Sequence, residues 1–113
     1  MMDLVGMVGN LLTDLDTTLS RTEFTRSNPL WQQLYALRLV LDDQQRSLVK
    51  LPIDENDESY RSASAQITSA NREIAGVISD PKRLADAIQG VAKATASMDM
   101  FLVGYKEPGP RRP

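Results

Sequence analysis

The fold is decided by residues 60–105, which read YRSASAQITSANREIAGVISDPKRLADAIQGVAKATASMDMFLVGY. Apolar side chains recur there at steps of three and four residues, on both sides of a break at Asp80-Pro81, and this spacing predicts two amphipathic helices. The first stripe is Tyr60, Ala63, Ile67, Ala70, Ile74 and Val77, and the second is Leu84, Ile88, Val91, Thr95, Met98, Leu102 and Tyr105. Asp80 suits an N-cap, and Pro81 suits the first helical position. Because the connection is short, we expect antiparallel neighbours.

Two further helices are predicted upstream of this pair. The first spans about residues 3–20, with an apolar stripe of Leu4, Val8, Leu11, Leu12, Leu15 and Leu19 and with Asp14, Asp16, Thr17 and Thr18 facing away. The second follows the cap signal Asn28-Pro29 and ends at about residue 50. Its stripe is Leu30, Leu34, Leu37, Leu41 and Leu48. A second apolar set, Trp31, Tyr35, Leu39 and Val40, either touches another helix or faces a partner.

The predicted fold is all-α: a four-helix up-down antiparallel bundle with a disordered C-terminal tail. A length of 113 residues fits one domain. We expect residues 1–105 to form the bundle and 106–113, rich in Pro and Arg, to form a flexible tail. The alternative is a helical hairpin pair that dimerises to complete its core. Gly6 and Gly9 indicate either a frayed first turn or a close approach by another backbone.

The composition excludes several kinds of chemistry. The chain has no cysteine and no histidine, so it cannot build a disulfide, a thiolate metal site or a Ser-His-Asp triad. A net charge of −2 argues against binding to nucleic acid. No apolar run approaches the ~20 residues of a membrane-spanning helix, and the N-terminus lacks the basic region of a signal peptide. We therefore expect a cytoplasmic protein that is not an enzyme, with no cofactor and no metal.

The most acidic stretch follows Pro52 and comprises Asp54, Glu55, Asn56, Asp57 and Glu58. Three of its residues match the first alternating positions of an EF-hand calcium loop. The pattern then fails, because Ser59 replaces the turn glycine and Ala65 replaces the final glutamate. We interpret the stretch as a solvated loop and helix start, or as an acidic surface for a basic partner. The pairs Asp14/Asp16 and Asp42/Asp43 are interpreted as solvated surface, since close neighbours do not share a helix face.

Two apolar groups have more than one interpretation. Trp31 and Tyr35 lie four residues apart on one face and fit either a core or an interface, where both residue types are common anchors. A second group near the end of the last helix fits core packing or an adaptable binding surface. It comprises Met98, Met100, Phe101, Leu102 and Val103.

Two segments resemble a known family. One is QLYALRLVLD at residues 33–42, and the other is IAGVISDPKRLADAI at residues 74–88. Together they resemble small all-helical immunity proteins of bacterial type VI secretion, of the kind that neutralises an NAD-degrading effector. In that family a helix with a leucine-arginine-leucine pattern precedes a helix that ends in an aspartate-proline turn, and a leucine-alanine-aspartate-alanine helix follows. The similarity spans roughly residues 31–98, and the acidic linker and the Arg/Pro tail depart from it.

The resemblance implies an antitoxin that covers the active site of a cognate toxin or effector domain. Such a protein needs no catalytic groups, which agrees with the composition. We expect aromatic anchors and acidic steering groups to form the partner-binding surface. Its predicted residues are Trp31, Tyr35, Asp42, Asp43, Asp54, Glu55, Asp57 and Glu58. The alternative function is a structural adaptor or secretion chaperone that homodimerises and holds a partner's segment.

Overall fold

The computed structural model describes residues 4–21, 26–51 and 58–106, and in these ranges the chain is helical without a β-strand. This confirms the predicted all-α class and the four helices. Their bounds are α1 (Leu4–Leu19), α2 (Pro29–Leu48), α3 (Glu58–Ser79) and α4 (Leu84–Lys106), the last preceded by the single 3₁₀ turn Pro81–Arg83. Helix α4 ends one residue beyond the predicted boundary, and the rest of the predicted tail, 107–113, lies outside the described residues.

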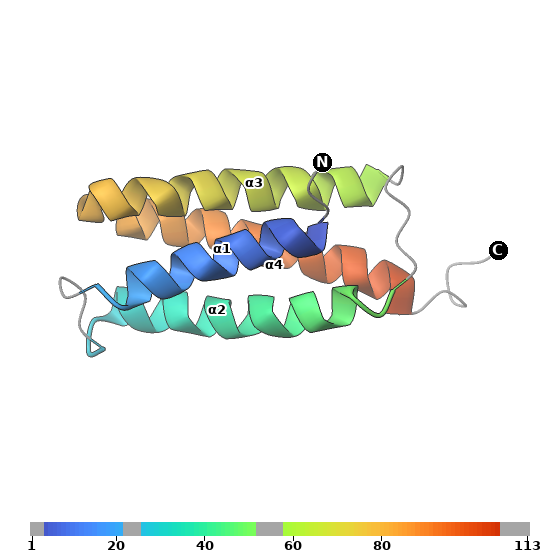
Figure 1. Ribbon diagram of the computed structural model, residues 1–113, viewed down its shortest axis with the longest axis horizontal. Helices are drawn as coiled ribbons and strands as arrows, with labels where there is room; N and C mark the ends of the chain where they lie inside the picture. Colours follow the sequence, from blue (N-terminus) through green and yellow to red (C-terminus); the bar gives the residue numbers. More distant parts are fainter. Residues whose placement is uncertain (1–3, 22–25, 52–57, 107–113) are drawn as a thin grey trace.

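The helices form a bundle in which the chain reverses direction from each helix to the next (Figure 1). Helix α1 packs against α2 and α3, and α4 packs against the same two helices. Within the described ranges, no Cα atom of α1 lies within 8 Å of one in α4, and the same holds for α2 and α3. The order around the bundle is therefore α1, α2, α4, α3. Helices α3 and α4 are antiparallel neighbours, as their short connection predicts, whereas α2 and α4 lie side by side and run parallel.

Both predicted cap signals are confirmed. The side chain of Asn28 accepts a hydrogen bond of 2.9 Å from the backbone N–H of Leu30, and Pro29 occupies the first position of α2. The side chain of Asp80 accepts a bond of 3.2 Å from Lys82 N–H at the start of the 3₁₀ turn. In each case a side-chain oxygen satisfies a donor that has no partner within the helix.

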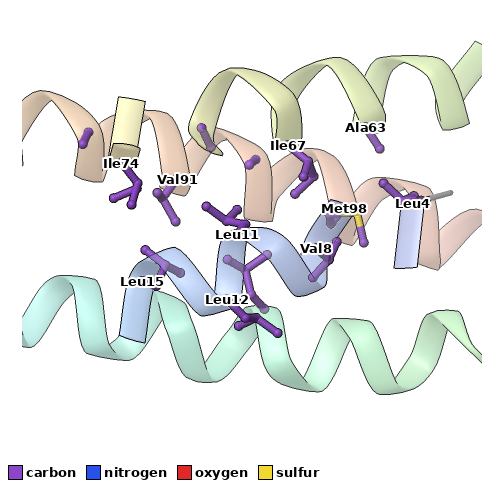
Figure 2. Close-up of a cluster of buried hydrophobic side chains, with 14 of the residues drawn as sticks. Leu4, Val8, Leu11, Leu12, Leu15, Ala63, Ile67, Ile74, Val91 and Met98 are labelled. Atoms are coloured by element: carbon purple, nitrogen blue, oxygen red, sulfur yellow. The ribbon is translucent and has the colours of Figure 1, made fainter. Parts of the chain in front are cut away.

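The core lies between the apolar stripes (Figure 2). All six predicted stripe residues of α3 are buried, as are the predicted residues of α4 from Leu84 to Leu102. The side chain of Tyr105 lies outside the described residues. Figure 2 shows the side chains of Leu11, Leu15 and Ile74 directed into the space between α1 and α3.

One expectation about the outer face of α1 is wrong. Thr18 is completely buried instead of facing away. Its hydroxyl donates 2.9 Å to the backbone oxygen of Asp14, so the helix itself satisfies the polar atom and the methyl group can pack. The spacing of Leu11, Leu15 and Thr18 already places them on one face. Asp14 is half-buried, and it accepts a 2.8 Å hydrogen bond from the side chain of Asn71 on α3.

Hydrogen bonds fix α1 at both of its ends. The first backbone N–H, that of Leu4, donates 3.1 Å to the hydroxyl of Tyr60 on α3. At the other end, Arg21 donates 2.6 Å to the backbone oxygen of Ile78 near the end of α3. These bonds set the position of α1 along α3 and therefore the position of the surface that α1 shares with α2.

Both glycines of the N-terminal segment lie inside α1. A side chain rather than a backbone approaches Gly9: a Cβ atom built there would lie 3.1 Å from Nε2 of Gln45. That amide donates 3.1 Å to the backbone oxygen of Val5. The glycine therefore leaves room for a hydrogen bond from α2 to α1.

Candidate partner-binding surface

Helix α2 buries only part of its apolar surface. Leu34, Leu41 and Leu48 are buried, at spacings of seven residues that keep them on the core side. Tyr35 and Leu39 lie away from that side and are 44% and 48% exposed. The predicted second apolar set therefore faces solvent over much of its surface. Spaced four residues apart on a rigid helix, Tyr35 and Leu39 form the centre of the candidate surface.

Trp31 plays a different part from Tyr35. Its ring stacks on that of Tyr35, with centroids 5.2 Å apart and planes inclined by 12°. Its Nε1–H donates 2.8 Å to the backbone oxygen of Leu19, the last residue of α1. The half-buried Trp31 thus joins two helices and holds the Tyr35 ring in place, whereas the exposed Tyr35 is not part of the core.

A hollow lies beside the aromatic pair, where α1 ends and α2 begins. The guanidinium carbon of Arg26 lies 5.9 Å from the centre of the Trp31 ring, a cation–π distance. The lining residues are Asp16, Leu19, Ser20, Arg26, Trp31 and Tyr35. The hollow combines aromatic and charged groups, which is typical of protein interfaces.

The charged groups next to Tyr35 form a network and not a bare acidic patch. Arg38 makes two bonds to the Asp16 carboxylate, from Nε at 2.9 Å and from Nη2 at 3.2 Å. Arg46 donates 2.6 Å to Asp42, and Asp43 lies 3.9 Å from Arg46. The hydrogen bonds that Arg38 donates to Asp16 raise the pKa of Arg38 above its usual value, so this cation stays charged.

Three carboxylates and two guanidinium groups give this network a net charge of −1. The electric field by which Asp42 and Asp43 could steer a charged partner is therefore weaker than the field of two unpaired carboxylates. The charged network places exposed hydrogen-bond donors and acceptors around the apolar centre formed by Tyr35 and Leu39.

The acidic stretch lies elsewhere. Asp54, Glu55 and Asp57 are outside the described residues, and Glu58 is the exposed first residue of α3. Helix α3 begins at the end of the bundle where α2 finishes, whereas Trp31 stands at the start of α2 (Figure 1). The structure thus groups Trp31, Tyr35, Asp42 and Asp43 along one helix and places Glu58 at the far end of the bundle.

The described residues do not form the metal sites considered above. Ser59 and Ala65 lie within the continuous helix α3, which excludes an EF-hand loop around them. Asp14 and Asp16 point to different helices, α3 and α2, so they do not form a carboxylate pair. Across the described ranges no three acidic side chains gather as metal ligands, and no helix there is long and apolar enough to cross a bilayer.

The methionine-rich group of α4 divides between core and surface. Met98, Phe101 and Leu102 are buried, whereas Met100 is 77% and Val103 46% exposed. The Phe101 ring meets Tyr60 edge-on at 6.0 Å.

Sequence reasoning missed a second feature, a hollow between α2 and α4. Its lining residues are Val40, Gln44, Thr95, Ala96 and Asp99. Gln44 is buried, with Nε2 donating 3.0 Å to the backbone oxygen of Thr95. The sequence does carry a signal for this burial, because Gln44 falls between Leu41 and Leu48 at the spacing of the core stripe.

Comparison of the chain with protein family models, with curated proteins and with solved structures gives no match.

Proposed function

We propose that this chain is a non-enzymatic immunity protein that binds and occludes one cognate bacterial toxin domain in the cytoplasm. The observation that carries the proposal is the exposed pair Tyr35 and Leu39 on the outer face of α2, in a bundle whose core already contains the other stripes. The resemblance of residues 33–42 and 74–88 to type VI immunity proteins supplies the class of partner.

The geometry of Tyr35 favours tight binding. A tyrosine at the centre of an interface contributes contact area while losing only a few side-chain rotations. Stacking on Trp31, whose Nε1–H is held by Leu19, restrains the Tyr35 ring before the partner arrives. Such preorganisation lowers the entropy lost on binding.

The ion pairs beside the apolar centre would determine orientation and partner choice. Arg38 and Arg46 offer donors and Asp42 and Asp43 offer acceptors, next to Leu39 on the same helix. Charges at the rim of an interface mainly affect the association rate and reject wrong partners. An occluding inhibitor needs this arrangement and no catalytic group.

The experiment starts with capture of partners by the tagged chain from its own cells. We expect one secreted effector at equal stoichiometry. Co-expression of that effector in a sensitive host should then deplete NAD and stop growth, and the immunity chain should prevent both. Growth arrest that the chain does not relieve, or recovery of several unrelated secreted chains, would overturn the proposal.

Matched variants locate the surface. Tyr35→Gln combined with Leu39→Gln should abolish protection while the far-UV circular dichroism and the melting temperature stay unchanged. Met100→Gln, which also removes an exposed apolar side chain but from α4, should protect as well as the original. Equal protection by all three proteins would exclude the outer face of α2.

The acidic stretch has a separate predicted role in steering. Replacing Asp54, Glu55, Asp57 and Glu58 by Asn or Gln should slow association with a basic toxin at low salt, with the effect shrinking as salt is added. The association rate is measured by stopped flow. An unchanged rate at low salt would rule out steering by these residues.

One observation favours the second candidate, an adaptor or secretion chaperone that homodimerises. The hollow between α2 and α4 is open to a segment of another chain, and Val40 at its edge is 45% exposed. This function requires a stable dimer or a complex with an extended peptide. Light scattering after size-exclusion chromatography distinguishes the two candidates, since the immunity protein is expected to form a one-to-one complex.

A further inference from the structure

The hollow between α2 and α4 combines apolar walls with oxygen acceptors. Val40 stands on α2 and Ala96 on α4. Asp99 follows Ala96 by three residues, so the two side chains lie on the same face of α4. Gln44 and Thr95 complete the lining. The two walls stand on α2 and α4, which lie side by side and run parallel (Figure 1). They therefore come from residues far apart in sequence.

Gln44 carries an acceptor for which the described part of the chain offers no donor. The residue is only 5% exposed, and its Nε2 donates to Thr95 O, which fixes which end of the amide is oxygen. Its Oε1 is buried and has no hydrogen-bond partner among the residues that the structure describes. The nearby Thr95 hydroxyl donates instead to the backbone oxygen of Ala92 at 2.8 Å. Buried acceptors are nearly always paired, so Oε1 indicates a donor that residues 4–21, 26–51 and 58–106 do not provide.

Asp99 adds a charge to the same hollow. It is exposed, and in the described part of the chain no cation lies within ion-pair distance of its carboxylate. By contrast, Asp16, Asp42 and Asp43 on the α1–α2 side all have arginine partners. The carboxylate and the amide oxygen, both without a partner among the described residues, are acceptors that belong to two residues lining one small space.

We infer that this hollow receives one arginine side chain of the partner protein. The aliphatic stem would lie on Val40 and Ala96, and the guanidinium would donate to the Asp99 carboxylate and to Gln44 Oε1. Two acceptors on different helices suit the planar fork of arginine better than the point charge of lysine. Because Oε1 is buried, the Gln44 side chain has to shift for the guanidinium to reach it, which would exchange its hydrogen bond to Thr95 O for one from the arginine.

The inference rests on the proposed function for the identity of the partner as the toxin. Val40 directly follows Leu39 and therefore lies about 100° further around α2, on the side that faces α4. A toxin that covers Tyr35 and Leu39 could therefore place an arginine between α2 and α4 in the same complex.

The test uses the full chain and a probe, Nα-acetyl-L-arginine amide, followed by two-dimensional ¹H–¹⁵N NMR. We expect saturable shifts of the Gln44 side-chain amide and of the backbone amides of Ala96 and Asp99, with a dissociation constant on the order of 1–10 mM. The citrulline analogue, which has the same shape without charge, should give no saturable shift.

Two variants and one control test the residues. Asp99→Asn should weaken binding of the probe about fivefold, the upper range for an exposed ion pair. Asp86→Asn, a matched change of an exposed carboxylate on the same helix, should leave binding unchanged. Gln44→Met, which keeps the volume but removes the acceptor, should also weaken binding, provided that its melting temperature shows an intact fold.

Three results would overturn the inference: no saturation by the probe, shifts spread over all carboxylates, or equal weakening by Asp99→Asn and Asp86→Asn. The outcome is separate from that of the proposed function. If the probe binds at the hollow but no toxin is neutralised, the site stands and the immunity function fails. If the toxin is neutralised but the probe does not bind, the function stands and the arginine site fails.

Discussion

Helices α2 and α3 have similar lengths, 20 and 22 residues, but they use their apolar side chains differently. Helix α3 buries all six residues of its stripe, and none of its large apolar side chains is exposed. Helix α2 buries Leu34, Leu41 and Leu48 and leaves Tyr35, Leu39 and Val40 at the surface. Folding alone thus accounts for the apolar sequence of α3, whereas part of the apolar sequence of α2 remains for another role.

Both helices pack against α1 and α4, so the difference lies in the composition of their outer sides. The outer side of α3 is polar, since Arg61, Thr68 and Arg72 face solvent there. The outer side of α2 mixes apolar and charged groups, a composition typical of an interface. If this contrast is correct, substitutions in α3 should change stability, and substitutions on the outer side of α2 should change binding.

The largest effect is expected for Ile74→Ala in α3. Ile74 is completely buried, so truncation should leave a cavity and lower the free energy of unfolding by about 2–5 kcal/mol. Leu39→Ala is the matched change in α2 and should alter it by less than about 0.5 kcal/mol. Urea unfolding followed by circular dichroism measures both. Similar losses for the two variants would contradict the contrast between the helices.

Tyr60→Phe should have the next largest effect. It removes the acceptor for the backbone N–H of Leu4, a buried donor at the first turn of α1. We expect a loss of about 1–3 kcal/mol in the free energy of unfolding, together with faster hydrogen exchange in α1. Tyr35→Phe, the same change on α2, should leave both quantities unchanged. Exchange that stays slow in α1 would mean that Tyr60 does not anchor the helix.

Trp31→Phe would sharpen the comparison, because Trp31 is the residue of the aromatic pair that also supports the fold. The change removes the hydrogen bond to Leu19 O and should lower the free energy of unfolding by about 1 kcal/mol. It should also loosen the Tyr35 ring and weaken toxin binding, which calorimetry with the captured effector would measure. A stability loss without weaker binding would assign Trp31 to the fold alone.

The smallest effect is expected for the ion pair between Arg38 and Asp16. A double-mutant cycle with Arg38→Gln and Asp16→Asn should give a coupling of about 0.5–1 kcal/mol, because the pair is bidentate but partly exposed. High salt should reduce the coupling. A coupling above about 2 kcal/mol would show that this charged pair stabilises the fold as strongly as a buried contact does.

Periodicity predicted most of the fold. The stripe of α3, that of α4 from Leu84 to Leu102, and the caps at Asn28 and Asp80 are local patterns, and each is confirmed. The burial of Thr18 was not predicted, because a threonine hydroxyl that bonds back to its own helix behaves as a small apolar group. The hollow at Gln44 was not predicted either, since Asp99 and Val40 meet only through the packing of α4 on α2.

The sequence by itself determined which residues form helices, where those helices begin and which face of each is apolar, because these depend on neighbours within a few turns. Only the tertiary structure decided that α2 lies beside α4 and diagonally from α3, and that Tyr35 and Leu39 stay exposed. Both features depend on how the apolar stripes of the four helices pack together in one core. A helix with two apolar faces can bury only the face that its neighbours cover.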